Sequence, residues 1–378
     1  MKPGRRNWLW VLTACMVVAG HPGARAEDGP AGITIPRIFD PFDRNAARCS
    51  PPPSLIRSLA FAQDNEREFI KGIAKGLAMA AKDRGLSFSA SIADNDAGKM
   101  VAQVDGFRSA RTGGLVVAPV DPASLAPALR KMIWQGAYVG AVVPPPATSL
   151  LNAPQYLTGK TLGDAAANYI RDKLGGKANV VLLTHDSLQF LAPRFAAMRD
   201  ALKDIPGVDV VADISPPTVN KEGGYRMMQT ILLAHPDVDV VLGADTVVLG
   251  ALQAVRAAGK ERKDQFFGGI DGEVEAVDEI KKGGSYRISI SLASSVFGYA
   301  MGQHAADWLD GKSIPQAMDI LPSALTAGNI RQYEADLANP AAVFNDPLRR
   351  DAYLRMYGNI CYDTRDQYVS FPWSSERK

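Results

Sequence analysis

The chain of 378 residues is 47% hydrophobic and 22% charged, which is typical of a globular protein with room for about two domains. Its formal net charge is +2, but residues 1–26 hold four basic side chains and no acidic one. Without that segment the net charge falls by four, to −2. The composition therefore argues against a protein that binds nucleic acid through a basic face.

Residues 1–26 have the three parts of a secretory signal peptide. A basic start precedes an apolar run over residues 8–19, which is too short to span a bilayer. Ala24–Ala26 then forms an A-x-A cleavage site, so we expect a mature chain that begins at Glu27 and is exported to the periplasm. The sequence before Cys15 also resembles a lipoprotein processing box, and a lipidated Cys15 is the alternative.

Cleavage before Glu27 leaves two cysteines, Cys49 and Cys361, which lie before the first expected strand and near the end of the chain. An oxidising compartment permits a disulfide between them, with two free buried thiols as the alternative. We expect no metal site and no cofactor, because the mature chain has three histidines and neither a C-x-x-C nor an H-x-x-x-H spacing.

Strands and helices alternate regularly from Ser54 onward. In the helix expected over 65–84, apolar side chains recur every fourth residue from Phe69 to Ala81, and Gly85 ends it. The elements expected in this half are strand 55–62, helix 65–84, strand 86–93, helix 99–111, strand 115–118, helix 122–135 and strand 138–143. Such β-α-β repetition predicts a parallel sheet covered by helices on both faces.

Three prolines at 144–146 interrupt this pattern, and a short extended segment is expected at 154–157. The alternation then resumes with helix 162–174, strand 179–184, helix 193–204, strand 208–214, helix 221–234, strand 238–243, helix 246–258, strand 265–270, helix 273–282 and strand 287–291. A helix at 295–310 and an extended piece at 318–325 follow. Two facing sheets of this kind would form a cleft lined by the loops at the carboxyl ends of their strands.

Several motifs resemble the ribose-binding family of type I periplasmic binding proteins. They include the segments 235–241, 243–245 and 267–272 in the second half and 117–121 in the first, and the likeness covers about residues 54–329. The resemblance implies an α/β fold of two Rossmann-like, doubly wound lobes joined by three crossovers, which close on a small molecule by hinge motion. It also implies delivery of the ligand to the permease of an ABC importer. The alternatives are a binding protein that presents its ligand to a membrane sensor kinase or chemoreceptor, or an accessory periplasmic protein of the same fold. In each case we expect a monomer.

The resemblance and the element pattern together predict the domain limits. They are a signal peptide at 1–26, an irregular arm at 27–53, lobe one at 54–150 and 293–316, lobe two at 151–292 and 317–329, and a helical or irregular C-terminal extension at 330–378.

Three charged residues of lobe two match ligand-binding positions of the family. Asp271 matches its ligand-binding aspartate, although it could instead cap the helix expected at 273. Arg194 matches a ligand-binding arginine, with a solvated first-turn side chain as the alternative. Asp245 follows Ala244, which occupies the place of the usual ligand asparagine, and Asp245 could bind ligand or serve as an N-cap.

Lobe one offers candidates in the loop after its first strand. Phe69 matches an aromatic residue that stacks on a sugar ring in the family, but it also lies on the apolar face of its own helix. Gln63, Asp64 and Arg67 lie in the same loop and could bind a polar ligand.

At two further ligand positions the family's polar side chains are replaced by Val143 and Leu292, as they are at Ala244. Sugar hydroxyls buried against these residues would be unpaired, at about 1–3 kcal/mol each. We therefore expect a less hydroxylated or partly apolar ligand, with an anionic group for Arg194 as one possibility. No nucleophile elbow, dinucleotide fingerprint or P-loop is present, and His185 alone is typical of a structural residue, so we do not expect an enzyme.

Overall fold

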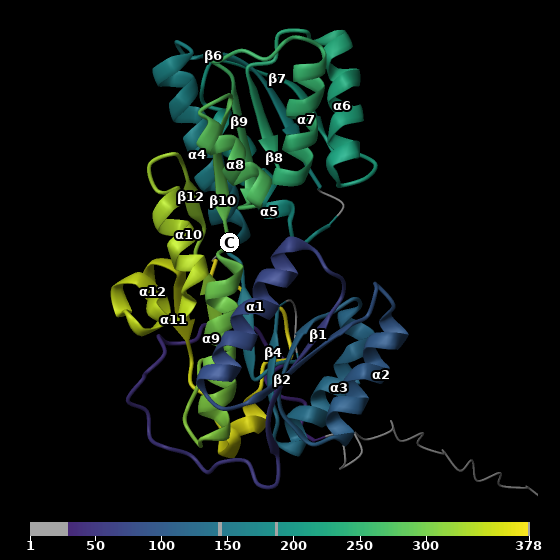
Figure 1. The fold of residues 1–378 in the computed structure, drawn as a ribbon, viewed down its shortest axis with the longest axis vertical. Coiled ribbons are helices and arrows are strands. Elements are labelled where there is room, and N and C mark those ends of the chain that lie inside the picture. Colours follow the sequence, from purple (N-terminus) through teal and green to yellow (C-terminus); the bar gives the residue numbers. More distant parts are fainter. Residues whose placement is uncertain (1–28, 143–145, 186–187, 377–378) are drawn as a thin grey trace, which may run out of the picture.

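The computed structural model describes residues 29–142, 146–185 and 188–376. The chain folds into two α/β lobes that lie end to end along the long axis of the molecule (Figure 1). The expected signal peptide and Val143 lie outside the described residues. Within the described part of the chain, no helix is both long and apolar enough to cross a membrane.

The first lobe is built on a seven-stranded sheet with the order β13-β11-β5-β4-β3-β1-β2. Every neighbouring pair is parallel except β11 with β13. The strands are β1 (Ile56–Gln63), β2 (Ser87–Ile92), β3 (Thr112–Ala118), β4 (Tyr138–Ala141), β5 (Ser149–Asn152), β11 (Ala317–Ile320) and β13 (Leu354–Tyr357). The helices are α1 (Glu68–Asp83), α2 (Ala97–Ser109), α3 (Pro122–Gln135) and α9 (Ser294–Leu309).

Helices α1 and α9 lie unusually close together on one face of this sheet. A Cβ atom added to Gly76 would lie 2.2 Å from the Ser295 carbonyl oxygen, and one on Gly298 would lie 2.5 Å from that of Ile73. Glycine at both positions therefore lets the two backbones touch, and it places the start of α9 against the middle of α1.

The second lobe contains a six-stranded sheet with the order β12-β10-β9-β8-β6-β7, in which only β12 runs antiparallel. Its strands are β6 (Lys177–Leu183), β7 (Gly207–Ile214), β8 (Val240–Gly243), β9 (Phe266–Asp271), β10 (Tyr286–Ser291) and β12 (Ser323–Leu325). Its helices are α4 (Gln155–Lys173), α5 (Ala192–Leu202), α6 (Lys221–Ala234), α7 (Asp245–Ala257) and α8 (Val274–Lys282). The doubly wound, two-lobed fold class is thus confirmed.

Two of the expected boundaries near the crossovers are wrong. The segment 317–320 was expected in lobe two, but as β11 it pairs with β5 in the sheet of lobe one. Its four residues are all buried, and the strand ends before Leu321-Pro322, so the chain crosses there and not after Gln316. The strand β5 likewise continues to Asn152, two residues past the expected limit of lobe one.

The segment 154–157 was expected to be extended, but α4 begins within it at Gln155. Pro154 precedes the helix, which suits a residue that cannot donate a hydrogen bond. Gly159 lowers the helix propensity of this first turn, yet glycine is required because a Cβ atom there would lie 1.8 Å from the Arg194 carbonyl oxygen. The close packing of α4 on α5 therefore overrides local propensity.

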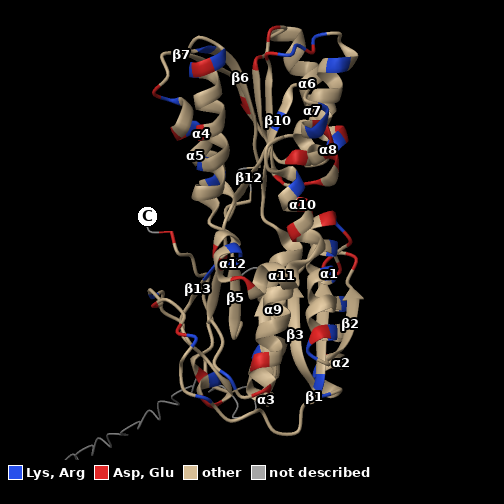
Figure 2. Ribbon diagram, turned by 60° about the vertical axis from the view of Figure 1, so that its left-hand side comes forward, with Lys and Arg blue, Asp and Glu red and all other residues tan. Residues whose placement is uncertain are grey.

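The C-terminal extension packs along α9 and across the edge of the first sheet (Figure 1). It comprises α10 (Ile330–Ala338), α11 (Pro340–Asn345), α12 (Pro347–Tyr353), strand β13 and the 3-10 helix η2 (Tyr362–Gln367). The strand was not expected from sequence. In the view of Figure 2, basic and acidic segments are interspersed over both lobes and the extension.

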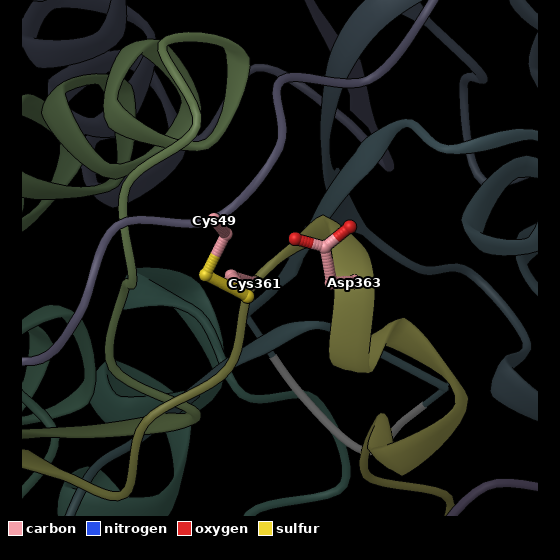
Figure 3. Close-up of side chains that lie close together, drawn as sticks. All are labelled: Cys49, Cys361 and Asp363. Carbon is pink, nitrogen blue, oxygen red and sulfur yellow. A yellow bond between two sulfur atoms is a disulfide. The ribbon is translucent and has the colours of Figure 1, made fainter.

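A disulfide joins the N-terminal arm to this extension. The sulfur atoms of Cys49 and Cys361 are bonded at 2.13 Å (Figure 3). Asp363 lies beside them and accepts a hydrogen bond from the Ser50 backbone N–H at 2.6 Å. These three side chains are the one group with metal-ligand spacing among the described residues, but both sulfurs are committed to the bridge. The bridge closes a chain segment of 312 residues and so ties both ends of the molecule to lobe one.

Candidate functional site

The carboxyl ends of the parallel strands in both lobes face the junction between the lobes, where open α/β sheets bind ligands. A hydrogen bond joins the two lobes at this junction. The Glu68 carboxylate at the start of α1 accepts from the Val274 backbone N–H at the start of α8, at 3.0 Å. The two helices thus bring the loops after β1 and β9 together, although these loops are about two hundred residues apart in sequence.

Asp271 ends β9 in a backbone conformation that few residues adopt. Its φ is 122°, and such strained angles in non-glycine residues cluster at functional sites. The alternative that Asp271 caps the next helix is wrong, because Glu273 is the N-cap residue of α8 and the N–H of Val274 binds Glu68. The Asp271 side chain is one-third exposed, and its charged partner is Arg194.

Arg194 lies in the first turn of α5, and its side chain is only 8% exposed. The alternative of a solvated first-turn arginine is therefore wrong. Its guanidinium lies 3.9 Å from the Asp271 carboxylate, and its Nε donates to the Gln155 side-chain oxygen at 2.9 Å. Burial raises the pKa of Asp271, and the charges of Arg194 and Arg67 oppose that rise. Because Arg67 belongs to lobe one, the two lobes interact electrostatically across the cleft.

Asp245 is a buried carboxylate that holds the turn next to Asp271 in place. It is fully buried and accepts hydrogen bonds from Tyr286 Oη at 2.7 Å, Ser289 Oγ at 2.6 Å and the Glu273 backbone N–H at 2.9 Å. Burial raises its pKa to about 6. The expected N-cap role is wrong, because Ala244 is the N-cap residue of α7 and Asp245 makes no cap bond to its own helix. Its carboxylate instead holds the turn that presents Asp271.

Glu273 has no cationic partner among the described residues. Burial raises its pKa to about 8, and the neighbouring charges of Asp245, Asp271 and Glu68 add to the rise. A carboxyl group whose folded pKa exceeds its unfolded value stabilises the fold most at low pH, and that contribution is lost as pH rises toward 8. Glu273 could not be predicted from the sequence, because its acidic neighbours come together only in the fold.

Glu273→Gln should therefore stabilise the protein at pH 9, by on the order of 1 kcal/mol, and have little effect at pH 4.5. Thermal unfolding of both proteins across this range measures the difference. Glu222→Gln is the matched control, because Glu222 is exposed and paired with Arg226 at 2.5 Å. Equal unfolding temperatures of wild type and Glu273→Gln at every pH would contradict the prediction.

In lobe one, the loop after β1 holds the expected polar residues. Arg67 Nη2 lies 2.5 Å from the Asp64 carboxylate, and its Nε donates to Asn65 Oδ1. Gln63 is buried at the end of β1, and its side-chain oxygen has no hydrogen-bond partner in the described structure. Phe69 is half-buried with its ring 5.6 Å from that of Phe297, so it packs against the core of its own lobe.

The structure describes two of the three apolar residues that replace polar ligand residues of the family. Leu292 is 4% exposed and belongs to the hydrophobic core, so it offers little surface to the cleft. Ala244 is partly exposed beside the buried Asp245. A residue of the extension also reaches this region, since Tyr333 Oη lies 2.5 Å from Ser291 Oγ at the end of β10. Sequence analysis gave no signal for that contact, which joins residues 42 positions apart.

Comparison with known proteins identifies the family of this chain. The periplasmic binding protein domain matches residues 59–313, and the chain belongs to that family, as the motifs predicted. It is 27% identical over 263 residues to the ribose import binding protein RbsB of Bacillus subtilis, covering 66% of this chain and 80% of the relative. It is 27% identical over 270 residues to the xylitol-binding protein of Mycolicibacterium smegmatis, covering 69% and 75%.

Solved structures share the fold. An ABC transporter solute-binding protein of Bacillus halodurans with bound myo-inositol superimposes with a TM-score of 0.64 at 21% identity, covering 75% of this chain and 98% of that one. A periplasmic solute-binding protein of Actinobacillus succinogenes with bound D-allose gives 0.65 at 19% identity, covering 73% and 99%. These proteins are matched almost entirely, so about a quarter of the present chain is additional to the shared fold.

Proposed function

We propose that this protein is an exported, monomeric binding protein that captures a small polar molecule between its lobes and delivers it to an ABC permease. The observation that carries the proposal is the buried Arg194 beside the partly exposed, strained Asp271. A charged pair at the carboxyl end of a sheet can bind hydroxyl or other polar groups strongly once the cleft closes and excludes water. Family membership and relatives named for ribose import and xylitol binding support this role.

Ligand binding should shift the molecule toward the closed arrangement, because a ligand favours the state in which both lobes contact it. The cross-lobe bond from Val274 to Glu68 supports such closure. Arg194 already has an acidic partner, so an anionic ligand would have to compete with Asp271 for it.

The ligand should carry fewer hydroxyls than a typical aldopyranose or ribose. The partly exposed Ala244 supports this expectation, since its side chain cannot hydrogen-bond a hydroxyl. Isothermal titration with ribose should then give a dissociation constant at least tenfold weaker than that of the preferred ligand, at about 1.4 kcal/mol per unpaired hydroxyl. Tight ribose binding would contradict this part of the proposal.

A second function is favoured by the C-terminal extension, which lies outside the residues that match the family domain. A binding protein of this fold could present its ligand to a sensor kinase or chemoreceptor through that surface. Import is tested by deleting the gene and measuring uptake of ribose, xylitol, myo-inositol and glycerol. We expect uptake of a bound compound to fall and to be restored by wild-type protein but not by Arg194→Ala. Unchanged uptake with a lost transcriptional or tactic response would favour the sensor.

A further inference from the structure

The end of the C-terminal extension crosses from lobe one to lobe two. From β13 to Trp373 the extension lies on lobe one, where β13 pairs with β11 and the Trp373 ring lies 5.2 Å from that of Tyr357. Three residues later, the Glu376 carboxylate accepts hydrogen bonds from the backbone N–H groups of Tyr156 at 3.1 Å and Leu157 at 2.7 Å. Both belong to the first turn of α4, in lobe two.

Helix α4 depends on this carboxylate for its cap. Pro154 is its N-cap residue and makes no side-chain cap bond. The first N–H groups of a helix have no partner within the helix, and the helix dipole favours a negative charge beside them. Glu376 supplies two acceptors and that charge from 219–220 residues away in the sequence.

The capped turn is the one that holds Arg194. Gln155, the first residue of α4, accepts the hydrogen bond from Arg194 Nε at 2.9 Å. Gly159, one turn further, packs directly on the Arg194 backbone carbonyl. Any displacement of this turn therefore moves both the backbone and the side-chain partner of Arg194, and with them the pair that Arg194 forms with Asp271.

The residues before Glu376 are anchored at the hinge. Asp319 in β11 is 2% exposed and accepts hydrogen bonds from Asn152 Nδ2 at 2.7 Å and Tyr357 Oη at 3.0 Å. Burial raises the pKa of Asp319, and a further hydrogen bond from Ser375 partly opposes that rise. This carboxylate therefore joins the ends of two crossover strands, β5 and β11, to β13 and to the residue that precedes Glu376.

We propose that Glu376 is a positioning residue of the binding cleft: by capping α4 from lobe one, it latches the lobes together across the hinge and holds Gln155 against Arg194. The effect of Glu376 on ligand binding depends on the proposed role of Arg194 in that binding. The latch itself is a property of the protein without ligand, so it can be tested separately.

The latch can be tested by hydrogen exchange with solvent in the full-length mature protein without ligand. Exchange is measured at backbone amides and at one arginine side chain. Amide exchange of Tyr156 and Leu157 reports the cap, and NMR exchange of the Arg194 Nε–H, assigned with Arg194→Lys, reports the bond to Gln155. We expect Glu376→Ala to accelerate both at least tenfold, and Glu376→Gln, which keeps an acceptor oxygen, to retain part of the protection. Glu222→Ala is the matched control, because Glu222 is an exposed glutamate of lobe two that pairs within its own helix with Arg226.

Faster exchange of Tyr156 and Leu157 with unchanged Arg194 Nε–H exchange would reduce Glu376 to a helix cap and overturn its positioning role. Unchanged exchange at both places, or equal acceleration in Glu222→Ala, would overturn the latch. Failure of the protein to bind any small molecule would overturn the proposed function but leave both exchange measurements interpretable.

Discussion

Asp271→Asn should weaken the binding of a hydroxylated ligand by about 30-fold, because a hydrogen bond to a charged group contributes about 1.5–3 kcal/mol and the substitution removes that charge. The Asp271 side chain is one-third exposed and lies 3.9 Å from the Arg194 guanidinium, which is beyond hydrogen-bonding distance, so its oxygens are available to a ligand. Asparagine is preferred to alanine as the replacement, because it keeps the shape of the aspartate side chain and removes only its charge. Titration of the variant with a compound that binds the wild-type protein measures the loss.

The matched control for this experiment is Asp278→Asn. Asp278 is also an aspartate of lobe two, but it is half-exposed and interacts with Lys281 at 3.6 Å on the surface of α8. Surface pairs of this kind contribute about 0–1 kcal/mol, so the control should bind as the wild type does. Unaltered affinity of Asp271→Asn would mean that the ligand binds elsewhere.

Removing the disulfide with the pair Cys49→Ser and Cys361→Ser should lower the free energy of unfolding by about 2–5 kcal/mol. The bridge spans 312 residues and therefore restricts a very long loop of the unfolded chain. It also holds the arm on an extension that contributes β13 to the sheet of lobe one. Urea unfolding of the oxidised wild type and the double variant, followed by circular dichroism, measures the difference in midpoint.

Reductant provides the control for the disulfide experiment. It should shift the midpoint of the wild type toward that of the double variant and leave the double variant unchanged. Identical midpoints for the oxidised wild type and the double variant would show that strand pairing and packing hold the extension without the bridge.

Most of the fold could be predicted because the strands are short apolar runs between amphipathic helices. The buried run of β3 and the four-residue spacing of apolar residues in α1 are local signals of a doubly wound sheet. The errors lie at the crossovers. The start of α4 is set by the close packing of Gly159 on Arg194, and the extended piece at 318–325 divides between two sheets. Neither feature can be read from local propensity.

The candidate site could be predicted only in part. Asp271 and Arg194 could be found because they follow strands at the spacing of a known family. Asp245 was found too, but its three hydrogen bonds assign it a supporting role that sequence did not indicate. Glu68 and Glu376 were missed because their partners are more than two hundred residues away. An acidic residue near the start of a helix or the end of a chain is too common to suggest a contact between lobes.

The central claim is that the cleft beside Asp271 and Arg194 binds a small molecule. A thermal-shift screen of residues 27–378 against sugars, polyols, organic acids and amines tests it most directly. A ligand present at one hundred times its dissociation constant should stabilise the protein by about 2.7 kcal/mol, and that stabilisation should be lost in Asp271→Asn. If no compound stabilises the wild type, or if every stabilising compound acts equally on the variant, the account is contradicted.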